Sequence, residues 1–440
     1  MIEIFQKANY YLVVNRSNLK WILGTEDLKK IASNLQKEEN LSPKEYALKQ
    51  YLESPSMQHQ PDWCLDNIKS IALMPTLGCN LKCIHCFYSS SPKEKAQWKP
   101  HVLEDVKRLL TQMDLPGGVT LTGGEPFQYK DVKELISFIL NNTNLRLNIM
   151  TNGVHIPLKE LEGWHKDHLS RLHIQVSLDG VSNSCYQKVR GVRVDSALNS
   201  IRSLRDMGAN LTLSFTLNKL IEEDFFKFIA FAESVDATMH FPFLEDFGRA
   251  AENSLEISPN HHQLMKFLIY YKLHVNPQAK ISFVDGLINA VKNKSLASHC
   301  QAAHGQIAIF PNGEIFPCSE LNLNDFQIGN ICDYHDLSQL EEDIRKFRSN
   351  SGFGQDVSEK ICTDCAFAYL CSGNCRAEEI LSHKDFFSPH SALRCAFLRD
   401  IYELAIWEVA LSQSQIPNYV DLIYESKIRD YVDEIKTTTN

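Results

Sequence analysis

The chain has 440 residues, of which 44% are hydrophobic and 22% charged, with a formal net charge of -9 from 45 basic and 54 acidic residues. This charge balance argues against the basic surface that nucleic-acid-binding proteins have. No apolar run approaches the ~20 residues of a membrane span, and the N-terminus lacks the pattern of a secretory signal. We therefore expect a soluble, cytoplasmic protein of about three domains, without a nucleic-acid or membrane partner.

Residues 1–64 are predicted to form a small separate α+β unit. β-Rich and amphipathic runs predict strands at 9–14 and 20–25 and helices at 25–36 and 42–53. Thr25 and Ser42 are residue types that cap helix N-termini, and the Ser- and Pro-containing stretch 54–61 predicts a linker. This unit could simply pack as a cap on the main domain, or it could bind a peptide along the edge of the strand at 9–14.

Residues 65–257 alternate β-rich runs with helical patterns, which implies parallel strands joined by right-handed crossovers. The predicted strands are 70–74, 119–122, 146–150, 173–178, 211–217 and 237–244. The predicted helices are 103–113, 131–140, a short polar piece near 157–168, 195–207 and 222–234. Six such units predict an α/β fold with a partial (β/α)6 TIM-like barrel, whose chemistry lies on loops at the C-terminal ends of the strands. The remaining predicted segments are a helical bridge at 258–295, a cysteine-rich domain at 296–400 and C-terminal helices at 401–440.

Thirteen cysteines are many for a cytosolic chain, in which clustered cysteines indicate metal binding before disulfides. The run CNLKCIHC places Cys79, Cys83 and Cys86 at the spacing C-x3-C-x2-C. A structural zinc site would need four closed ligands, and His85 is poorly placed to supply the fourth because it adjoins Cys86. Three thiolates on a [4Fe–4S] cluster would instead leave one iron open to bind a substrate. Three cysteines stand apart and are expected to be plain thiols: Cys64, Cys185 and Cys332.

This spacing, after a first strand in a six-unit βα chain, resembles the radical SAM superfamily. The resemblance implies a cluster on Cys79, Cys83 and Cys86 whose open iron binds S-adenosylmethionine. It also implies that reductive cleavage of this cofactor yields methionine and a 5′-deoxyadenosyl radical, which abstracts hydrogen atoms.

The resemblance further implies that later loops contact the cofactor. The TGGEPF loop after the second strand would meet the methionyl amino group, its glycines allowing close backbone approach. The residues implied are Gly123, Gly124, Glu125 and Pro126. Thr151 and Asn152 would lie near the ribose, and Ser177 would meet the methionyl carboxylate. Arg190 is a second candidate for that carboxylate because a guanidinium suits it, whereas Asp179 could also be a simple helix or turn cap.

Seven further cysteines, with Gly313 ahead of the second, resemble the SPASM extension of peptide-modifying radical SAM enzymes. In that family Cys362, Cys365, Cys371 and Cys395 would hold an outer auxiliary cluster, and Cys300, Cys318 and Cys375 an inner one. With the first cluster this makes three [4Fe–4S] clusters. Some relatives carry an eighth cysteine where this chain has Gln306, so the inner cluster has an open iron or takes His304, water or an acid as its fourth ligand.

The residue after Cys318 distinguishes sulfatase-maturing relatives from thioether-forming peptide maturases. Sulfatase-maturing relatives carry an Asp there as a base, whereas this chain has Ser319 and then Glu320. The chain resembles instead the sactipeptide-type, thioether-forming peptide maturases, and residues 1–64 would be their leader-peptide-binding (RRE-like) unit. Partners would then be a precursor peptide and an electron donor such as ferredoxin or flavodoxin. Alternatives are a C–C or C–O crosslink, epimerisation, sulfatase-maturase-like protein oxidation, or a non-catalytic iron–sulfur protein.

Overall fold

The computed structural model describes residues 2–37, 41–54, 68–162, 168, 170–295, 300–353, 358–373, 375–383, 385–388 and 391–439. The expected linker after Ser54 and Cys64 lie outside the described residues. No helix in this described part is long and apolar enough to cross a membrane.

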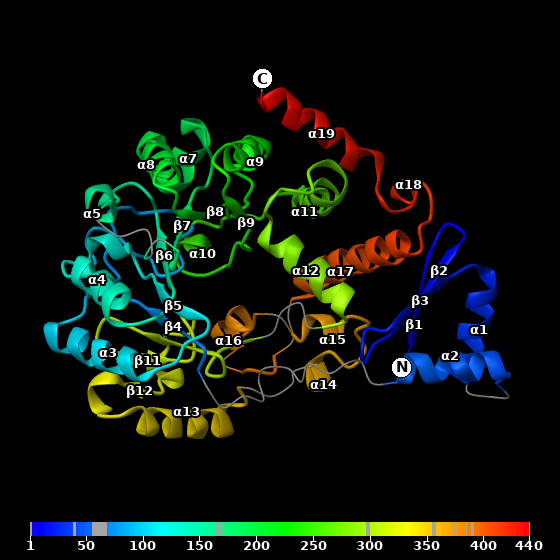
Figure 1. Cartoon of the computed structure of the whole chain (residues 1–440), viewed down its shortest axis with the longest axis horizontal. Coiled ribbons are helices and arrows are strands. Elements are labelled where there is room, and N and C mark those ends of the chain that lie inside the picture. Colours follow the sequence, from blue (N-terminus) through cyan, green and yellow to red (C-terminus); the bar gives the residue numbers. More distant parts are fainter. Residues whose placement is uncertain are drawn as a thin grey trace.

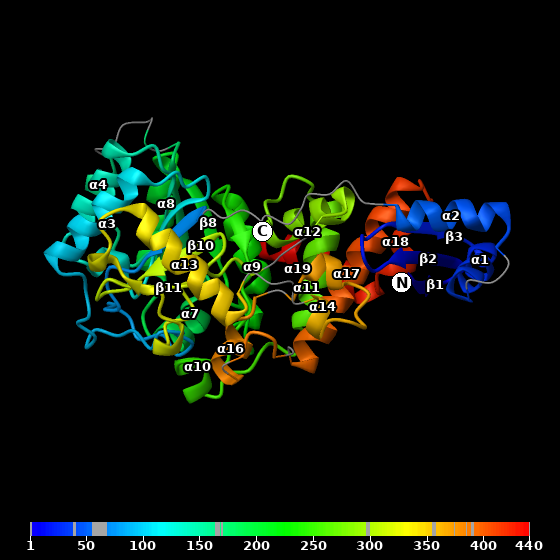
Figure 2. The same cartoon turned by 90° about the horizontal axis from the view of Figure 1, so that it is seen from below.

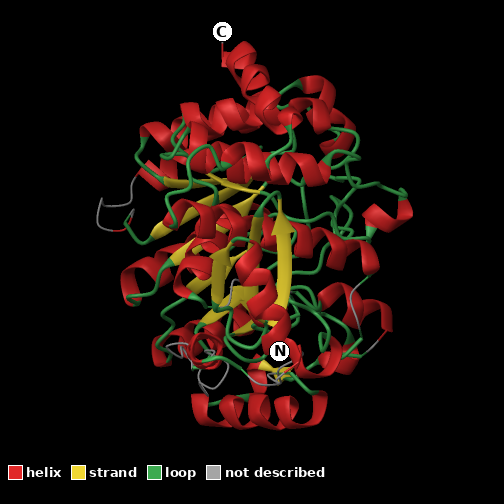
Figure 3. Ribbon diagram, turned by 90° about the vertical axis from the view of Figure 1, so that its right-hand side faces the viewer, coloured by secondary structure: helices red, strands yellow, loops and turns green. Residues whose placement is uncertain are grey.

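A nine-stranded sheet forms the centre of the described chain, in the order β12-β11-β10-β4-β5-β6-β7-β8-β9 (Figure 1). Six of its strands are those predicted from the sequence, and they pair in parallel: β4 Ser70–Leu73, β5 Gly118–Leu121, β6 Leu147–Thr151, β7 Leu172–Ser177, β8 Asn210–Ser214 and β9 Thr238–His240. The predicted partial barrel is therefore confirmed. Its strands are largely apolar because helices cover them on the outside (Figure 3).

The cysteine-rich region extends this sheet, which the sequence did not predict. β10 Gln306–Ile309 pairs in parallel with β4, placing Gln306 opposite Ser70. β11 Glu314–Phe316 and β12 Gly329–Asn330 follow in antiparallel pairing. The barrel and the cysteine-rich region thus share one sheet and cannot be described as two separately packed bodies.

Helices cover the outer face of the six parallel strands. They are α3 Pro100–Gln112, α4 Val132–Asn142, α5 Leu158–Glu162, α7 Asn183–Arg190, α8 Asp195–Asp206 and α9 Phe225–Ser234. The short α10 Arg249–Glu252 instead packs against the loop that contains Cys83 and Ser90. In α3 the buried residues recur every three or four positions, from Val102 to Leu110, which is the spacing of one helix face. The sequence did not predict α7, whose N-terminus is capped by the side chain of Ser182 and whose C-terminus ends at Gly191 with φ of 77°.

Helices of the bridge and the C-terminus pack mainly on one another and on α9. They are α11 His261–Tyr270, a π-helical turn at Tyr271–Val275, α12 Ser282–Asn293, α17 Ala392–Gln413, α18 Val420–Ile423 and α19 Ser426–Thr439. α17 is buried along most of its length and passes through residue 400, so it belongs both to the cysteine-rich region and to the C-terminal helices. The shorter helices of the cysteine-rich region are α13 Leu337–Ser351, α14 Ser358–Ile361, α15 Ala368–Cys371 and α16 Ala377–His383. Four 3-10 turns complete the elements of the described residues: Pro126–Gln128, Glu222–Asp224, Asn324–Phe326 and Ile331–Asp333.

The N-terminal unit lies at the far end of the molecule from α3 and α4 (Figure 2). It contains β1 Ile2–Lys7, β2 Tyr10–Asn15, β3 Trp21–Gly24, α1 Glu26–Lys37 and α2 Pro43–Glu53. Ser42 caps α2 as predicted, in a capping box with Glu45. The expectation that the strand at 9–14 offers an edge is wrong, because β2 is paired on both sides and the edges are β1 and β3. β1 was not predicted from the sequence, and without it β2 looked like an edge strand.

Candidate active site

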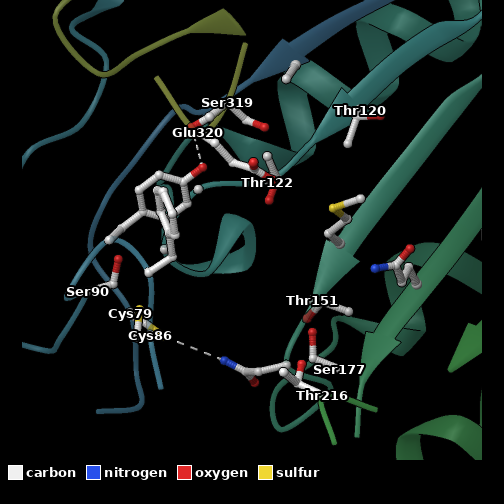
Figure 4. Close-up of a pocket in the computed structure, with 18 of the residues that line it drawn as sticks. Cys79, Cys86, Ser90, Thr120, Thr122, Thr151, Ser177, Thr216, Ser319 and Glu320 are labelled. Carbon is white, nitrogen blue, oxygen red and sulfur yellow. Dashed lines mark hydrogen bonds between the residues drawn. The ribbon is translucent and has the colours of Figure 1, made fainter. Parts of the chain in front are cut away.

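A cavity of about 450 Å³ lies at the C-terminal ends of the parallel strands. Its walls include Cys79, Cys83, Cys86, Gly123, Gly124, Thr151, Asn152, Ser177, Arg190, Gln306 and Glu320. Figure 4 shows Cys79 and Cys86 on one side of this cavity and Ser319 and Glu320 on another. The cavity therefore brings together residues from the first cysteine set and from the cysteine-rich region, which are more than 200 positions apart in the sequence.

The first cysteine set lies on one loop that lines this cavity. All three thiols are free of disulfides. The backbone amide of Leu81 donates to Cys79 Sγ at 3.3 Å, and Asn152 Nδ2 lies 3.8 Å from the same sulfur. Burial raises the pKa of Cys79 to about 12, so a metal that binds thiolate is what would deprotonate it. Three thiols on one wall of a cavity fit a [4Fe–4S] cluster with one open iron.

Arg249 anchors the cysteine loop, and the sequence analysis did not single it out. Its guanidinium donates to the backbone carbonyls of Cys83 at 2.7 Å and Ser90 at 2.6 Å. The preceding Gly248 adopts φ of 54°, and a Cβ there would lie 2.2 Å from the carbonyl oxygen of Phe87. These contacts give the FGRA sequence at 247–250 a physical role in holding the cysteine loop.

The GGEP loop packs directly against the residues that precede Cys79. A Cβ at Gly123 or Gly124 would lie only 2.3 or 2.2 Å from the carbonyl oxygen of Thr76 or Gly78. Both glycines are thus required by neighbouring backbone, independently of any ligand. Pro126 follows them as the first residue of a 3-10 turn. Contact of this loop with the methionyl amino group stays a prediction.

Glu125 is buried and ties the GGEP loop to the end of β6. Its carboxylate accepts hydrogen bonds from Thr151 Oγ1 and from the backbone amide of Asn152, both at 2.8 Å. Burial raises the pKa of Glu125 to about 7, although these hydrogen bonds oppose the rise. Because its carboxylate binds Thr151 and Asn152, Glu125 fixes the GGEP loop relative to the end of β6.

Arg190 faces the cavity between a carboxylate and a cluster cysteine. Its Nε and Nη2 atoms donate to Asp179 Oδ2 at 2.9 and 2.6 Å, and its Nη1 atom lies 3.9 Å from Cys83 Sγ. The other oxygen of Asp179 accepts from the backbone amide of Thr216, and His85 Nε2 lies 3.1 Å from Oδ2. Burial alone would raise the pKa of Asp179, but Arg190 and His85 outweigh it and hold that pKa well below its usual range. Asp179 is thus a buried anchor for Arg190, and the proposed role of Arg190 toward a carboxylate stays a prediction.

The four cysteines expected to form the outer set surround a second, smaller cavity. Cys362, Cys365, Cys371 and Cys395 all line this space of about 140 Å³. Burial raises the pKa of Cys362 to about 11 and that of Cys371 to about 12. Four thiols that line one small space fit a fully ligated cluster.

The three cysteines expected to form the inner set lie in one apolar cluster with Leu321, Phe326 and Phe353. Burial raises the pKa of Cys318 and of Cys375 well above the usual thiol value, and the nearby carboxylate of Glu320 adds to both shifts. Cys375 Sγ lies 3.4 Å from Glu320 Oε2. Cys300, Cys318 and Cys375 therefore form a group beside an acid, in which Cys318 is buried and the other two are partly buried. This group fits a cluster with three cysteine ligands.

Comparison with known families and proteins agrees with this arrangement. Residues 73–232 match the family model of the radical SAM superfamily, and residues 300–366 match that of the SPASM iron–sulfur cluster-binding domain. The first match contains Cys79, Cys83, Cys86 and the GGEP loop. The second begins at Cys300. This chain accordingly binds S-adenosylmethionine and more than one [4Fe–4S] cluster.

Among curated proteins, the chain is 26% identical to the antilisterial bacteriocin subtilosin biosynthesis protein AlbA of Bacillus subtilis, over 59% of this chain and 56% of AlbA. It is 24% identical to an AdoMet-dependent heme synthase of Methanosarcina barkeri, over 72% of this chain and 93% of that protein. Among solved structures, Streptococcus suis SuiB bound to S-adenosylmethionine superposes with a TM-score of 0.59 at 16% identity, over 89% of this chain and 98% of SuiB. The chain is thus an enzyme of the radical SAM superfamily that carries a C-terminal SPASM iron–sulfur domain.

Proposed function

We propose that this enzyme uses the radical from S-adenosylmethionine to modify a ribosomally made precursor peptide, by a thioether crosslink between a cysteine sulfur and a carbon atom. One observation carries the proposal. The cysteine loop that begins at Cys79 and the turn that follows Cys318 face the same cavity. A substrate in this cavity would lie between the cofactor and the inner cysteine set. Similarity to AlbA and to SuiB, which has also been solved with its precursor peptide SuiA, supports a peptide as substrate.

In this proposal the residues around the cavity bind and orient the cofactor. Arg190, held by Asp179, takes the methionyl carboxylate together with Ser177, and the loop fixed by Glu125 takes the amino group. Thr151 and Asn152 lie beside the ribose. When bound, the cluster and S-adenosylmethionine supply a carbon-centred radical on one-electron reduction by a donor such as ferredoxin or flavodoxin.

The domains divide the work in the same proposal. The barrel at 65–257 holds the cofactor, and the SPASM domain at 296–400 holds two auxiliary clusters. The helical bridge at 258–295 and the C-terminal helices at 401–440 connect and cover them. The unit at 1–64 binds the leader of the precursor, for which the free edges are β1 and β3.

The test is anaerobic incubation of the reconstituted enzyme with S-adenosylmethionine, a reductant and a cysteine-containing precursor encoded beside it. We expect a product lighter by two hydrogens in which one cysteine no longer reacts with a thiol-alkylating reagent under reducing conditions. Mass spectrometry of the alkylated and untreated peptides measures both properties.

Two results would contradict the thioether while keeping the radical enzyme. A product that has lost two hydrogens, yet alkylates at every cysteine, would indicate a carbon–carbon or carbon–oxygen crosslink. A product of unchanged mass that acquires deuterium from heavy water would indicate epimerisation.

A further inference from the structure

Glu320 lies where the two halves of the site meet. It follows Cys318 by two positions, after the end of β11, and its side chain lines the main cavity (Figure 4). Its Oε2 atom is 3.4 Å from Cys375 Sγ, although the two residues are 55 positions apart. Through this contact Glu320 touches the inner cysteine set from the cavity side.

The surroundings of Glu320 are poor in compensating charge. Its side chain is partly buried, and the carboxylate of Glu245 lies nearby with the same charge. Arg394 carries the opposite charge, but its guanidinium pairs directly with Glu245 at 2.9 Å. A carboxylate withdrawn from solvent is normally paired or bound to a metal.

The backbone that carries Glu320 is fixed by Tyr88. The Tyr88 hydroxyl donates to the carbonyl oxygen of Ser319, and its ring packs edge-on against Phe310 at a centroid distance of 6.3 Å. Tyr88 comes from the loop just after Cys86, so the first cysteine loop helps to position Glu320.

We propose that the Glu320 carboxylate is the fourth protein ligand of the inner auxiliary cluster, beside Cys300, Cys318 and Cys375. The inference rests on the proposed assignment of these three cysteines to one cluster. Among the alternatives that Gln306 leaves open, it selects an acid, so that the fourth iron is covered by an oxygen ligand. A carboxylate is a harder and more exchangeable iron ligand than a thiolate, so the iron stays available to a substrate cysteine.

The ligand is tested on the auxiliary clusters alone. In a background with Cys79, Cys83 and Cys86 all changed to Ala, only these clusters contribute to the spectra. After anaerobic reconstitution and reduction, ¹³C-cyanide is added, and ¹³C hyperfine coupling in the electron paramagnetic resonance spectrum reports binding to iron. We expect Glu320→Gln to bind cyanide at least tenfold more tightly than the same background with Glu320, because no carboxylate competes.

Two further variants make the result specific. Glu245→Gln removes a carboxylate from the same cavity and should leave cyanide affinity unchanged. Glu320→Cys supplies a thiolate and should suppress cyanide binding below the level seen with Glu320. If Glu320→Gln itself loses about four irons, the count of one [4Fe–4S] cluster, Glu320→Cys should restore them.

Equal cyanide affinity with Glu320 and with Glu320→Gln, or loss of the inner cluster in both Glu320→Gln and Glu320→Cys, would overturn the assignment. If the inner cluster did not exist, the result would be different. The variant with Cys79, Cys83 and Cys86 changed to Ala would then hold about four irons, the count of one cluster, instead of about eight, even with Glu320 unchanged.

Discussion

At the scale of single residues, the site depends on a few buried charges that fix one another. Asp179 is completely buried and binds Arg190 through two nitrogen atoms, while the remaining guanidinium nitrogen approaches Cys83. Such a two-point contact sets the orientation of the guanidinium as well as its position. Arg190, which lines the cavity, is therefore oriented by a residue that does not line it.

Replacing Arg190 with Lys should weaken S-adenosylmethionine binding at least tenfold, because an ammonium group cannot hold Asp179 at two points and also reach the cavity. Binding is measured by equilibrium dialysis with the reconstituted enzyme. The control is Arg193→Lys, three positions along the chain, where the side chain is 70% exposed and pairs with Asp195. If both variants bound S-adenosylmethionine with equal affinity, the proposed contact of Arg190 with the cofactor would be contradicted.

The buried carboxyl group of Glu125 should make stability depend on pH. Its pKa in the folded protein is about 7, against 4.5 as the ordinary value, so between these values the folded protein holds the extra proton and its stability falls as pH rises. The substitution Glu125→Gln abolishes this titration. Between pH 5 and 7, the free energy of unfolding of the original protein should therefore fall by about 2–3 kcal/mol more than that of the variant. Urea unfolding under anaerobic conditions measures it. Glu434 is exposed, so Glu434→Gln should leave the pH dependence of the unfolding free energy unchanged. If the difference in unfolding free energy between the original protein and Glu125→Gln did not change with pH, the raised pKa of Glu125 would be contradicted.

Much of the site could be predicted from local sequence, because the cysteine spacing and the GGEP loop are short motifs in fixed positions after strands. The supporting partners could not be predicted. Arg249 acts on Cys83 from 166 positions away, and Glu320 meets Cys375 only because the cysteine-rich chain folds back on itself. Asp179 was read as a candidate cap, since nothing in its neighbourhood in the sequence shows that it is buried beside Arg190.

At the scale of elements, the N-terminal unit touches the outer cysteine set directly. Arg16, next to the end of β2, donates to the carbonyl oxygens of Thr363 and Cys365, and Phe5 of β1 stacks on Phe367 with ring centroids 5.5 Å apart. The apolar, β-branched run of β2 and the amphipathic pattern of the helices made these elements predictable here. β1 was missed because Glu3, Gln6 and Lys7 make its run more polar than that of β2, although both strands have six residues.

Deleting residues 1–64 should weaken modification of the precursor and leave slow, uncoupled S-adenosylmethionine cleavage, because the barrel cysteines and the cofactor cavity lie outside this unit. Product formation is followed by mass spectrometry, and 5′-deoxyadenosine release by chromatography. A truncated enzyme that modifies the full precursor at the original rate would show that the unit is only a cap.

Replacing Arg16 with Ala should speed loss of the outer cluster without touching any cysteine. Two hydrogen bonds from a charged donor contribute about 1.5–3 kcal/mol each, so we expect at least a tenfold faster decay of iron–sulfur absorbance in the presence of a chelator. Lys20→Ala is the matched control, since Lys20 contacts Tyr51 and Ser54 within its own unit. The same decay rate in both variants would contradict a link between the unit and the cluster loop.

At the scale of the whole molecule, three groups of cysteines lie in three separate places, two lining cavities and one beside Glu320. About twelve irons per chain are therefore expected after anaerobic reconstitution, four for each cluster. Changing Cys79, Cys83 and Cys86 to Ala should remove about four irons and all cleavage of S-adenosylmethionine, whereas changing the outer four should remove about four irons only. Iron and zinc analysis measures both, and an original count near four, or zinc in place of iron, would contradict the assignment.

The pairing of β10 with β4 has a consequence for how the chain is made. β4 is complete by residue 73, but its neighbour on one side begins only at residue 306. During synthesis the nascent barrel carries an unpaired strand edge for more than 200 residues, and an open edge is a template for pairing with other chains. The buried Trp98 likewise lacks its hydrogen-bond acceptor until late in synthesis, because its indole nitrogen donates to the carbonyl oxygen of Phe310. The radical SAM barrel of this enzyme is thus finished by its SPASM segment, and a fragment that ends before residue 300 should aggregate instead of folding as a smaller enzyme.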